Sequence, residues 1–162
     1  MESTDKNNGG YLVGVIADTH GLVRLSALEA LEGSNLILHA GDVGKLEVLD
    51  ALRAVAPVQA VRGNTDRGPW VQTLPLTRAV EVAGTWIYLL HDLSQLDLDP
   101  VAAGFDVVIS GHSHHAYKNR DSGVIFLNPG SAGPRRFNLS VSVARLYIQG
   151  DIIQAEIVPI DV

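Results

Sequence analysis

The stretch YLVGVIADTH, residues 11–20, joins a continuous apolar run to a polar Asp-Thr-His triplet. An apolar run of strand length without alternation is typical of a parallel strand that is covered on both faces. Asp18 and His20 follow the predicted strand directly, and both are side chains that bind divalent metal ions. We therefore looked for further buried strands that end on metal-binding side chains.

The first half of the chain alternates predicted strands and helices. LILHA (36–40) and PVQAV (57–61) are apolar runs of strand length. Leucines at three-residue spacing in LVRLSALEALEG (22–33) and KLEVLDALRAV (45–55) predict two helices, the first ending at Gly33. The β-α-β-α-β order predicts parallel strands with right-handed crossovers.

The second half is predicted to be mainly antiparallel. Turn residues between apolar runs predict hairpins around Gly84, around Asp121-Ser122-Gly123 and around Gly150-Asp151. DPVAAG (99–104) predicts a short helix with an Asp N-cap and a Gly stop, and DVVIS (106–110) predicts another buried strand. We expect a flexible polar tail over residues 1–10 and one α/β domain over residues 11–162.

Composition narrows the class of protein. The net charge of −6 gives no strong nucleic-acid signal, and the absence of cysteine excludes disulfides and zinc-thiolate sites. There is no apolar run long enough to span a bilayer and no pattern typical of a signal peptide, so we expect a cytoplasmic protein without a membrane partner. The sequence leaves homo-oligomerisation open.

Each of five predicted strands runs into a candidate metal ligand. Because ligand sites of open α/β sheets lie outside the carboxyl ends of the strands, we expect these side chains to converge. Glycines at 41, 63 and 111 precede some of them, where a bend is needed and a Cβ would crowd a bound ion or phosphate. The candidate ligands are Asp18, His20, Asp42, Asn64, His91, His112 and His114.

Each candidate taken alone has a plainer explanation. Asp and Asn after a strand are ordinary turn formers or N-caps, and a lone histidine such as His91 is more often a satisfied core residue. The joint pattern favours metal. Four His, two Asp and one Asn exceed one tetrahedral zinc site but suit two ions that share a carboxylate. Imidazole with carboxylate favours Mn, Fe, Zn, Co or Ni over Ca or Mg.

The ordered motifs resemble those of the calcineurin-like metallophosphoesterases. They are DTH (18–20), GD (41–42), GNTD (63–66), His91 and GHSH (111–114). The contexts LHAGDV (38–43), VRGNTD (61–66) and LNPGSAGPRR (127–136) are similar to the small bacterial and archaeal phosphodiesterase branch of that superfamily.

The resemblance implies a four-layer αββα sandwich of two mixed sheets flanked by helices. It implies one ion held by Asp18, His20, Asp42 and His114, and a second held by Asp42, Asn64, His91 and His112. Asp42 would bridge two divalent transition-metal ions, for which we favour Mn. A hydroxide shared by the ions would attack phosphorus, and Asn64 would stabilise the developing charge. Asp42, Asn64 and His112 are our candidate catalytic residues.

Two positions depart from the motifs. Many relatives carry His where this chain has Thr65, and that histidine is a proposed proton donor to the leaving group. Either another group donates the proton here, or good leaving groups are preferred. Relatives commonly show His-Gly-His where this chain has His91-Asp92-Leu93, so Asp92 adds negative charge near the predicted cleft.

Neighbouring polar residues allow both structural and functional readings. We predict that His39 is a buried histidine bonded to backbone, and that Asp66 either bonds a ligand histidine or caps a turn. If residues 112–115 are extended, His112 and His114 share a face and His115 lies on the other. The roles of three arginines stay open between phosphate binding and solvated loop: Arg62, Arg135 and Arg136.

The function predicted from these residues is a dinuclear-metal phosphodiesterase that acts on a small phosphate ester. A phosphomonoesterase or a nucleotide-pyrophosphate hydrolase would use the same metal core. A third alternative is a non-catalytic scaffold like the retromer subunit that shares this fold. The intact set of seven ligands favours an enzyme over a scaffold.

Overall fold

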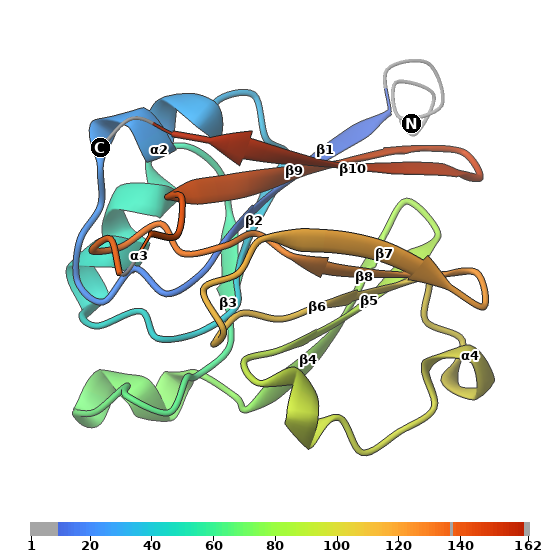
Figure 1. The fold of residues 1–162 in the computed structure, drawn as a ribbon, viewed down its shortest axis with the longest axis horizontal. Helices are drawn as coiled ribbons and strands as arrows, with labels where there is room; N and C mark the ends of the chain where they lie inside the picture. Colours follow the sequence, from blue (N-terminus) through green and yellow to red (C-terminus); the bar gives the residue numbers. More distant parts are fainter. Residues whose placement is uncertain (1–9, 137, 161–162) are drawn as a thin grey trace.

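The computed structural model describes residues 10–136 and 138–160. Apart from Gly10, the tail predicted for residues 1–10 therefore lies outside the described residues. The described part forms two five-stranded mixed sheets with an apolar core between them, and helices lie on their outer faces (Figure 1). This confirms the architecture that the sequence resemblance implies.

The first sheet contains the parallel strands predicted for the first half of the chain. Its order is β10-β9-β1-β2-β3, in which β1, β2 and β3 are parallel and β9 and β10 form an antiparallel hairpin. The strands span Tyr11–Ile16 (β1), Leu36–His39 (β2), Val58–Ala60 (β3), Ser142–Gln149 (β9) and Ile152–Pro159 (β10).

The second sheet contains the two other predicted hairpins. Its order is β4-β5-β6-β8-β7, in which β5, β6 and β8 are parallel and the two edge strands are antiparallel to their neighbours. The strands span Thr77–Val82 (β4), Thr85–Leu90 (β5), Val107–Ile109 (β6), Tyr117–Asp121 (β7) and Val124–Asn128 (β8).

Short helices cover the outer faces. Helices α2 (Leu25–Ala30) and α3 (Leu46–Arg53) pack on the first sheet, but the leucine stripes are only partly core, because Leu22, Leu25 and Leu46 are exposed. The unpredicted 3₁₀ turn η2 (Leu93–Gln95) packs on the second sheet through Leu93, and α4 (Pro100–Ala103), with the predicted Asp99 cap, follows it with no buried residue. A second unpredicted 3₁₀ turn, η1, spans Pro69–Thr73. None of the helices in the described residues is long and apolar enough to cross a membrane.

The two sheets bring their parallel strand ends to one edge of the molecule. In the first sheet these are the carboxyl ends of β1, β2 and β3, and in the second those of β5, β6 and β8. A hydrogen bond joins the two sets, because His91 Nδ1, just after β5, lies 2.7 Å from the backbone oxygen of Ala40, just after β2. The loops that carry the candidate ligands therefore meet where the sheets meet.

Candidate metal centre

The loops after the strands are tied together by backbone hydrogen bonds. The loop after β1 lies along the loop after β2, since Asp18 N donates to Gly41 O (3.0 Å) and His20 N donates to Asp42 O (2.9 Å). Across the sheets, the His112 backbone N–H donates to Asp18 Oδ2 at 3.0 Å. Residues separated by about a hundred positions in sequence thus share one site.

The backbone of this site is held in an uncommon conformation. Non-glycine residues in the left-handed region cost roughly 1–2 kcal/mol each, and such conformations cluster at functional sites. Because His112 and His114 lie there, residues 112–115 are not extended, and the face-sharing argument made for them from sequence is wrong. The candidate ligands with φ between 48° and 71° are Asp18, His20, Asp42, His112 and His114.

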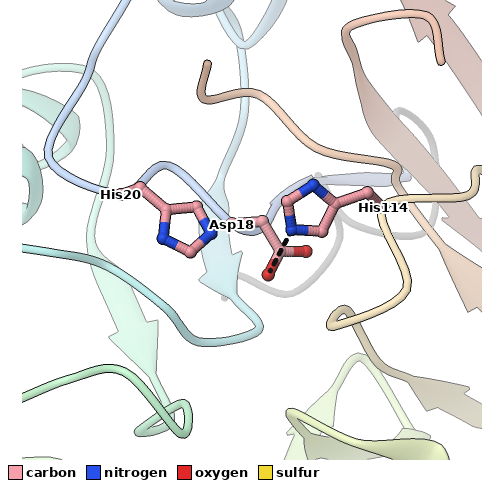
Figure 2. Close-up of side chains that lie close together, drawn as sticks. All are labelled: Asp18, His20 and His114. Carbon is pink, nitrogen blue, oxygen red and sulfur yellow. Dashed lines mark ion pairs between the residues drawn. The ribbon is translucent and has the colours of Figure 1, made fainter. Parts of the chain in front are cut away.

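The first group of ligands is Asp18, His20 and His114 (Figure 2). One ligand atom from each lies within 4.8 Å of the others, and Asp18 Oδ1 is 3.6 Å from His114 Nε2. Among the described residues, Asp18 Oδ1 and His20 Nε2 are buried atoms of this group without a protein hydrogen-bond partner. Because buried polar atoms are nearly always paired, these atoms fit a site that takes a cation.

The second group surrounds Nε2 of His91. Asn64 Oδ1 lies 3.0 Å from this nitrogen, Asp42 Oδ2 lies 3.3 Å from it, and His112 Nδ1 lies 3.3 Å from it. The backbone carbonyl of Ala40 can only accept, so Nδ1 of His91 carries a proton and donates it. In the neutral ring Nε2 is then an acceptor that faces the oxygen acceptors of Asp42 and Asn64, and a proton or a metal cation at this position would satisfy these oxygens.

Two carboxylates lie between the groups. Asp42 Oδ2 is 3.8 Å from His20 Nε2 and 3.3 Å from His91 Nε2. Asp18 Oδ1 is 3.9 Å from His91 Nε2, and Asp18, Asp42 and His91 form a further set of ligand atoms within 4.8 Å. The position of Asp42 suits the bridging role expected of it, and Asp18 lies against both groups as well.

The carboxylates respond to this surrounding in opposite ways. Burial raises the pKa of Asp18 to about 7, although the charge of His91 acts to lower it. Burial also acts to raise the pKa of Asp42, but hydrogen bonds from His91 and Thr65 hold that pKa well below its usual range. The Thr65 bond is a backbone N–H donated to Asp42 Oδ1 at 2.9 Å. Asp42 is therefore the more strongly anionic of the two.

The imidazoles of the first group favour the neutral form that binds metal. Burial, followed by the charges of Arg136 and His20, lowers the pKa of His114 to about 4. Burial also lowers the pKa of His20.

His91 of the second group behaves differently. Burial acts to lower the pKa of His91, but the bonds of His91 to Asp42 and Ala40 outweigh burial and raise that pKa. Asp42 therefore favours positive charge at Nε2 of His91.

Two side chains, His39 and Asp66, form hydrogen bonds to the loops that carry the ligands. His39 is fully buried, accepts the Gly41 N–H at Nδ1 (3.1 Å) and bonds Thr19 Oγ1 at Nε2 (2.9 Å), and burial lowers its pKa to about 3. The predicted backbone bond of His39 is confirmed. Asp66 caps turns, because its carboxylate accepts backbone N–H groups of Val43, Gly44 and Gly63.

The glycines before the ligands leave space for ligand side chains. A Cβ on Gly41 would lie 2.6 Å from His91 Nδ1, and one on Gly63 would overlap Asp42 Oδ1. A Cβ on Gly111 would lie 3.0 Å from Asp18 Oδ2. A side chain at these glycines would therefore clash with the candidate ligands themselves.

The loop after β8 also packs against the site, and its Asn128-Pro129-Gly130 turn is predicted from sequence as scaffolding near the site. Ser131 Oγ donates to the backbone oxygen of Asp18 at 3.1 Å, and a Cβ on Gly133 would overlap that same oxygen. The buried Asn128 side chain donates to Gly111 O at 2.9 Å. Since β8 is parallel to β6, the strand-end rule also places this loop at the site.

The other residues noted in the sequence differ in whether they lie near a ligand group. Arg136 is exposed, but its charge acts on the pKa values of Asp18, His20 and His114, so it lies at the first group. Arg62 is half-buried in a cleft beside Asn64. Three side chains are exposed and not part of either ligand group: Thr65, His115 and Arg135.

The chain is similar to one protein family and to several known proteins. A family model described as the calcineurin-like phosphoesterase superfamily domain matches residues 11–151. A "probable metallophosphoesterase" of Methanothermobacter thermautotrophicus is 38% identical over 160 residues, which cover 91% of each protein. Vps29 of Entamoeba histolytica, solved with Zn²⁺, aligns with a TM-score of 0.68 at 26% identity over 90% of this chain and 97% of that one. An archaeal phosphodiesterase shares the fold, with a TM-score of 0.76 at 21% identity over 91% of this chain and 99% of that one. The chain belongs to the calcineurin-like phosphoesterase superfamily.

Proposed function

We propose that the protein is a metal-dependent phosphoric ester hydrolase that cleaves phosphodiesters with two divalent cations. The observation that carries the proposal is the second ligand group, where the oxygen acceptors of Asp42 and Asn64 and a ring nitrogen of His112 converge on His91 Nε2. The first ligand group lies beside it and has buried polar atoms without a protein partner, which supports a second cation there.

The residues fit two ions that share Asp42. Asp18, His20 and His114 with Asp42 would hold one, and Asn64, His91 and His112 with Asp42 would hold the other. Imidazole and carboxylate together suit Mn, Fe, Zn, Co or Ni, among which we favour Mn. When bound, such a pair supplies Lewis-acid charge for a phosphoryl group and acidifies water to give a nucleophile.

The chain's own residues would orient the phosphate. With Oδ1 of Asn64 directed at His91, its Nδ2 group is left to donate to a phosphoryl oxygen. The positive charge of Arg136 acts on Asp18 of the first group. The His112 side chain is 45% exposed, so the second group faces solvent and is open to a substrate. Thr65 has no imidazole to protonate a leaving group, which favours esters of acidic alcohols.

A cleft of about 750 Å³ extends from Asn64 and His91 and favours a diester. Asp92 and Asp97 line it, and their charges oppose a second negative charge on the substrate. A phosphate monoester is largely dianionic at pH 7, because its second pKa is about 6, whereas a diester carries one charge. Leu76 and Tyr88 give the cleft apolar surface for the organic group of the second ester.

The test is hydrolysis by protein stripped with a chelator and reloaded with Mn²⁺. We expect bis-p-nitrophenyl phosphate to be cleaved with a higher kcat/KM than p-nitrophenyl phosphate. The opposite preference would assign a phosphomonoesterase. Hydrolysis of neither ester with any of the five metals would reject the enzyme and leave a binding role, as expected for a scaffold.

A further inference from the structure

Asp92 follows the candidate ligand His91 at a position where related motifs carry glycine. It begins the 3₁₀ turn η2 as the N-cap: Asp92 Oδ1 accepts the Ser94 backbone N–H at 3.0 Å and the Ser94 hydroxyl at 2.8 Å. Two donors thus hold one carboxylate oxygen in place. The other oxygen, Oδ2, takes part in neither bond.

This free oxygen faces a ligand histidine. Asp92 Oδ2 lies 3.8 Å from His112 Nε2, while Nδ1 of the same ring lies 3.3 Å from His91 Nε2 inside the second ligand group. The ring of His112 therefore stands between the carboxylate and the candidate metal position. One nitrogen is directed to each.

We propose that Asp92 is a positioning residue that fixes Nδ1 of His112 as a metal-binding atom by accepting the proton on Nε2. The inference rests on the proposed function, since it names the partner of one of the proposed ligands. A neutral imidazole carries one proton, so a carboxylate at Nε2 leaves the lone pair on Nδ1. Carboxylate partners of this kind orient ligand histidines and raise their basicity in metal sites.

The cap explains why this partner can act at a partly exposed place. A surface carboxylate usually loses side-chain freedom when it pairs, and the pairing is then worth little. Here Ser94 already immobilises the carboxylate before His112 is engaged. The side chain that replaces glycine after His91 is thus aimed at a ligand of the same metal group.

The test compares Asp92→Asn with Ser94→Ala. Asparagine keeps an oxygen for the cap, but turns an NH₂ donor toward Nε2 and so favours the wrong His112 tautomer. We expect Zn²⁺ binding to metal-free protein, measured by calorimetry, to weaken about 10-fold to 100-fold in Asp92→Asn. Ser94→Ala removes one bond to the carboxylate and keeps the carboxylate itself, so its affinity should stay within about threefold of the wild type.

A second readout is independent of metal and activity. ¹⁵N NMR of metal-free protein at pH 8, above the ordinary imidazole pKa of about 6.5, reports the tautomer of His112. We expect the Nε2–H form to decrease in Asp92→Asn. Unchanged Zn²⁺ affinity together with an unchanged tautomer would overturn the inference, even if the enzyme hydrolyses diesters. A shifted tautomer in a protein that hydrolyses no ester would support the inference and reject the proposed function.

Discussion

Nδ1 of His91 lies 2.7 Å from the backbone oxygen of Ala40, and this bond joins the two sheets at the site. It fixes the tautomer of His91 and points Nε2 at Asp42 and Asn64. This hydrogen bond thus joins the two sheets and determines which nitrogen of His91 is offered to a metal.

Asp42→Ala should remove metal and activity together. Asp42 lies against both ligand groups, so its loss should lower the bound metal below two equivalents, measured by elemental analysis. We expect hydrolysis of the diester to fall by at least about a hundredfold, since charge stabilisation at the phosphoryl group is lost. Asp50→Ala changes an exposed carboxylate on α3 and should bind metal and react as the wild type does. Full activity in Asp42→Ala would place the site elsewhere.

Gly63→Ala should damage the site through sterics alone. The added Cβ would overlap Asp42 Oδ1 and the Asp42 backbone nitrogen, so the loop must shift at a cost of about 1–3 kcal/mol. Urea unfolding should show this loss, and calorimetry should show weaker Mn²⁺ binding. The control is Gly84→Ala in the β4–β5 turn, where a Cβ meets nothing within 4 Å. Its φ of +84° costs about 1 kcal/mol, with no change in Mn²⁺ affinity.

Asp18→Asn should stabilise the metal-free protein at high pH. Burial raises the pKa of Asp18 from 3.8 to about 7, so the folded chain holds this proton to higher pH than the unfolded chain does. The wild type therefore loses unfolding free energy as pH rises through that window, by up to about 1.4 kcal/mol per pH unit. Asparagine carries no such charge, so its advantage should be present at pH 8 and absent near pH 4.

Urea unfolding in EDTA at both pH values measures this difference. With saturating Mn²⁺ the order should reverse, because the wild type then gains the binding free energy that the variant lacks. An equal difference between the two proteins at pH 4 and pH 8 would show that Asp18 is not buried as a charge.

Arg136→Ala should raise KM for bis-p-nitrophenyl phosphate. Arg136 is an exposed charge next to the first ligand group, so we expect a change of about fivefold, in keeping with a solvent-screened contact of about 1 kcal/mol. The matched control is Arg135→Ala, because Arg135 is equally exposed and its charge does not enter the pKa values of the ligands. Equal effects of the two substitutions would reject a specific role.

Much of the fold followed from local sequence signals. Apolar runs located the buried strands, and turn residues located the hairpins. The Asp99-Pro100 cap and Gly104 located α4. The packing of two sheets came from the family resemblance, because strand periodicity says nothing about which sheet a strand joins. Leu25 fits a helical stripe but is 71% exposed, at the first residue of α2.

The candidate site was predictable in composition but not in backbone conformation. Asp and His after strands marked the ligands, yet nothing local indicates that His112 and His114 have left-handed backbones. Tertiary bonds impose that conformation, such as His112 N to Asp18 Oδ2 and Gly111 N to His91 O. Asp92 is the N-cap of η2 and accepts from Ser94, but the apolar pattern alone did not predict this turn.

The rate of bis-p-nitrophenyl phosphate hydrolysis as a function of added Mn²⁺ tests the central claim most directly. Metal-free protein should be inactive, and the rate should rise until two equivalents of Mn²⁺ are bound and then level off. Saturation at one equivalent would contradict a dinuclear centre. No hydrolysis at any Mn²⁺, Fe²⁺, Zn²⁺, Co²⁺ or Ni²⁺ concentration would contradict a phosphodiesterase.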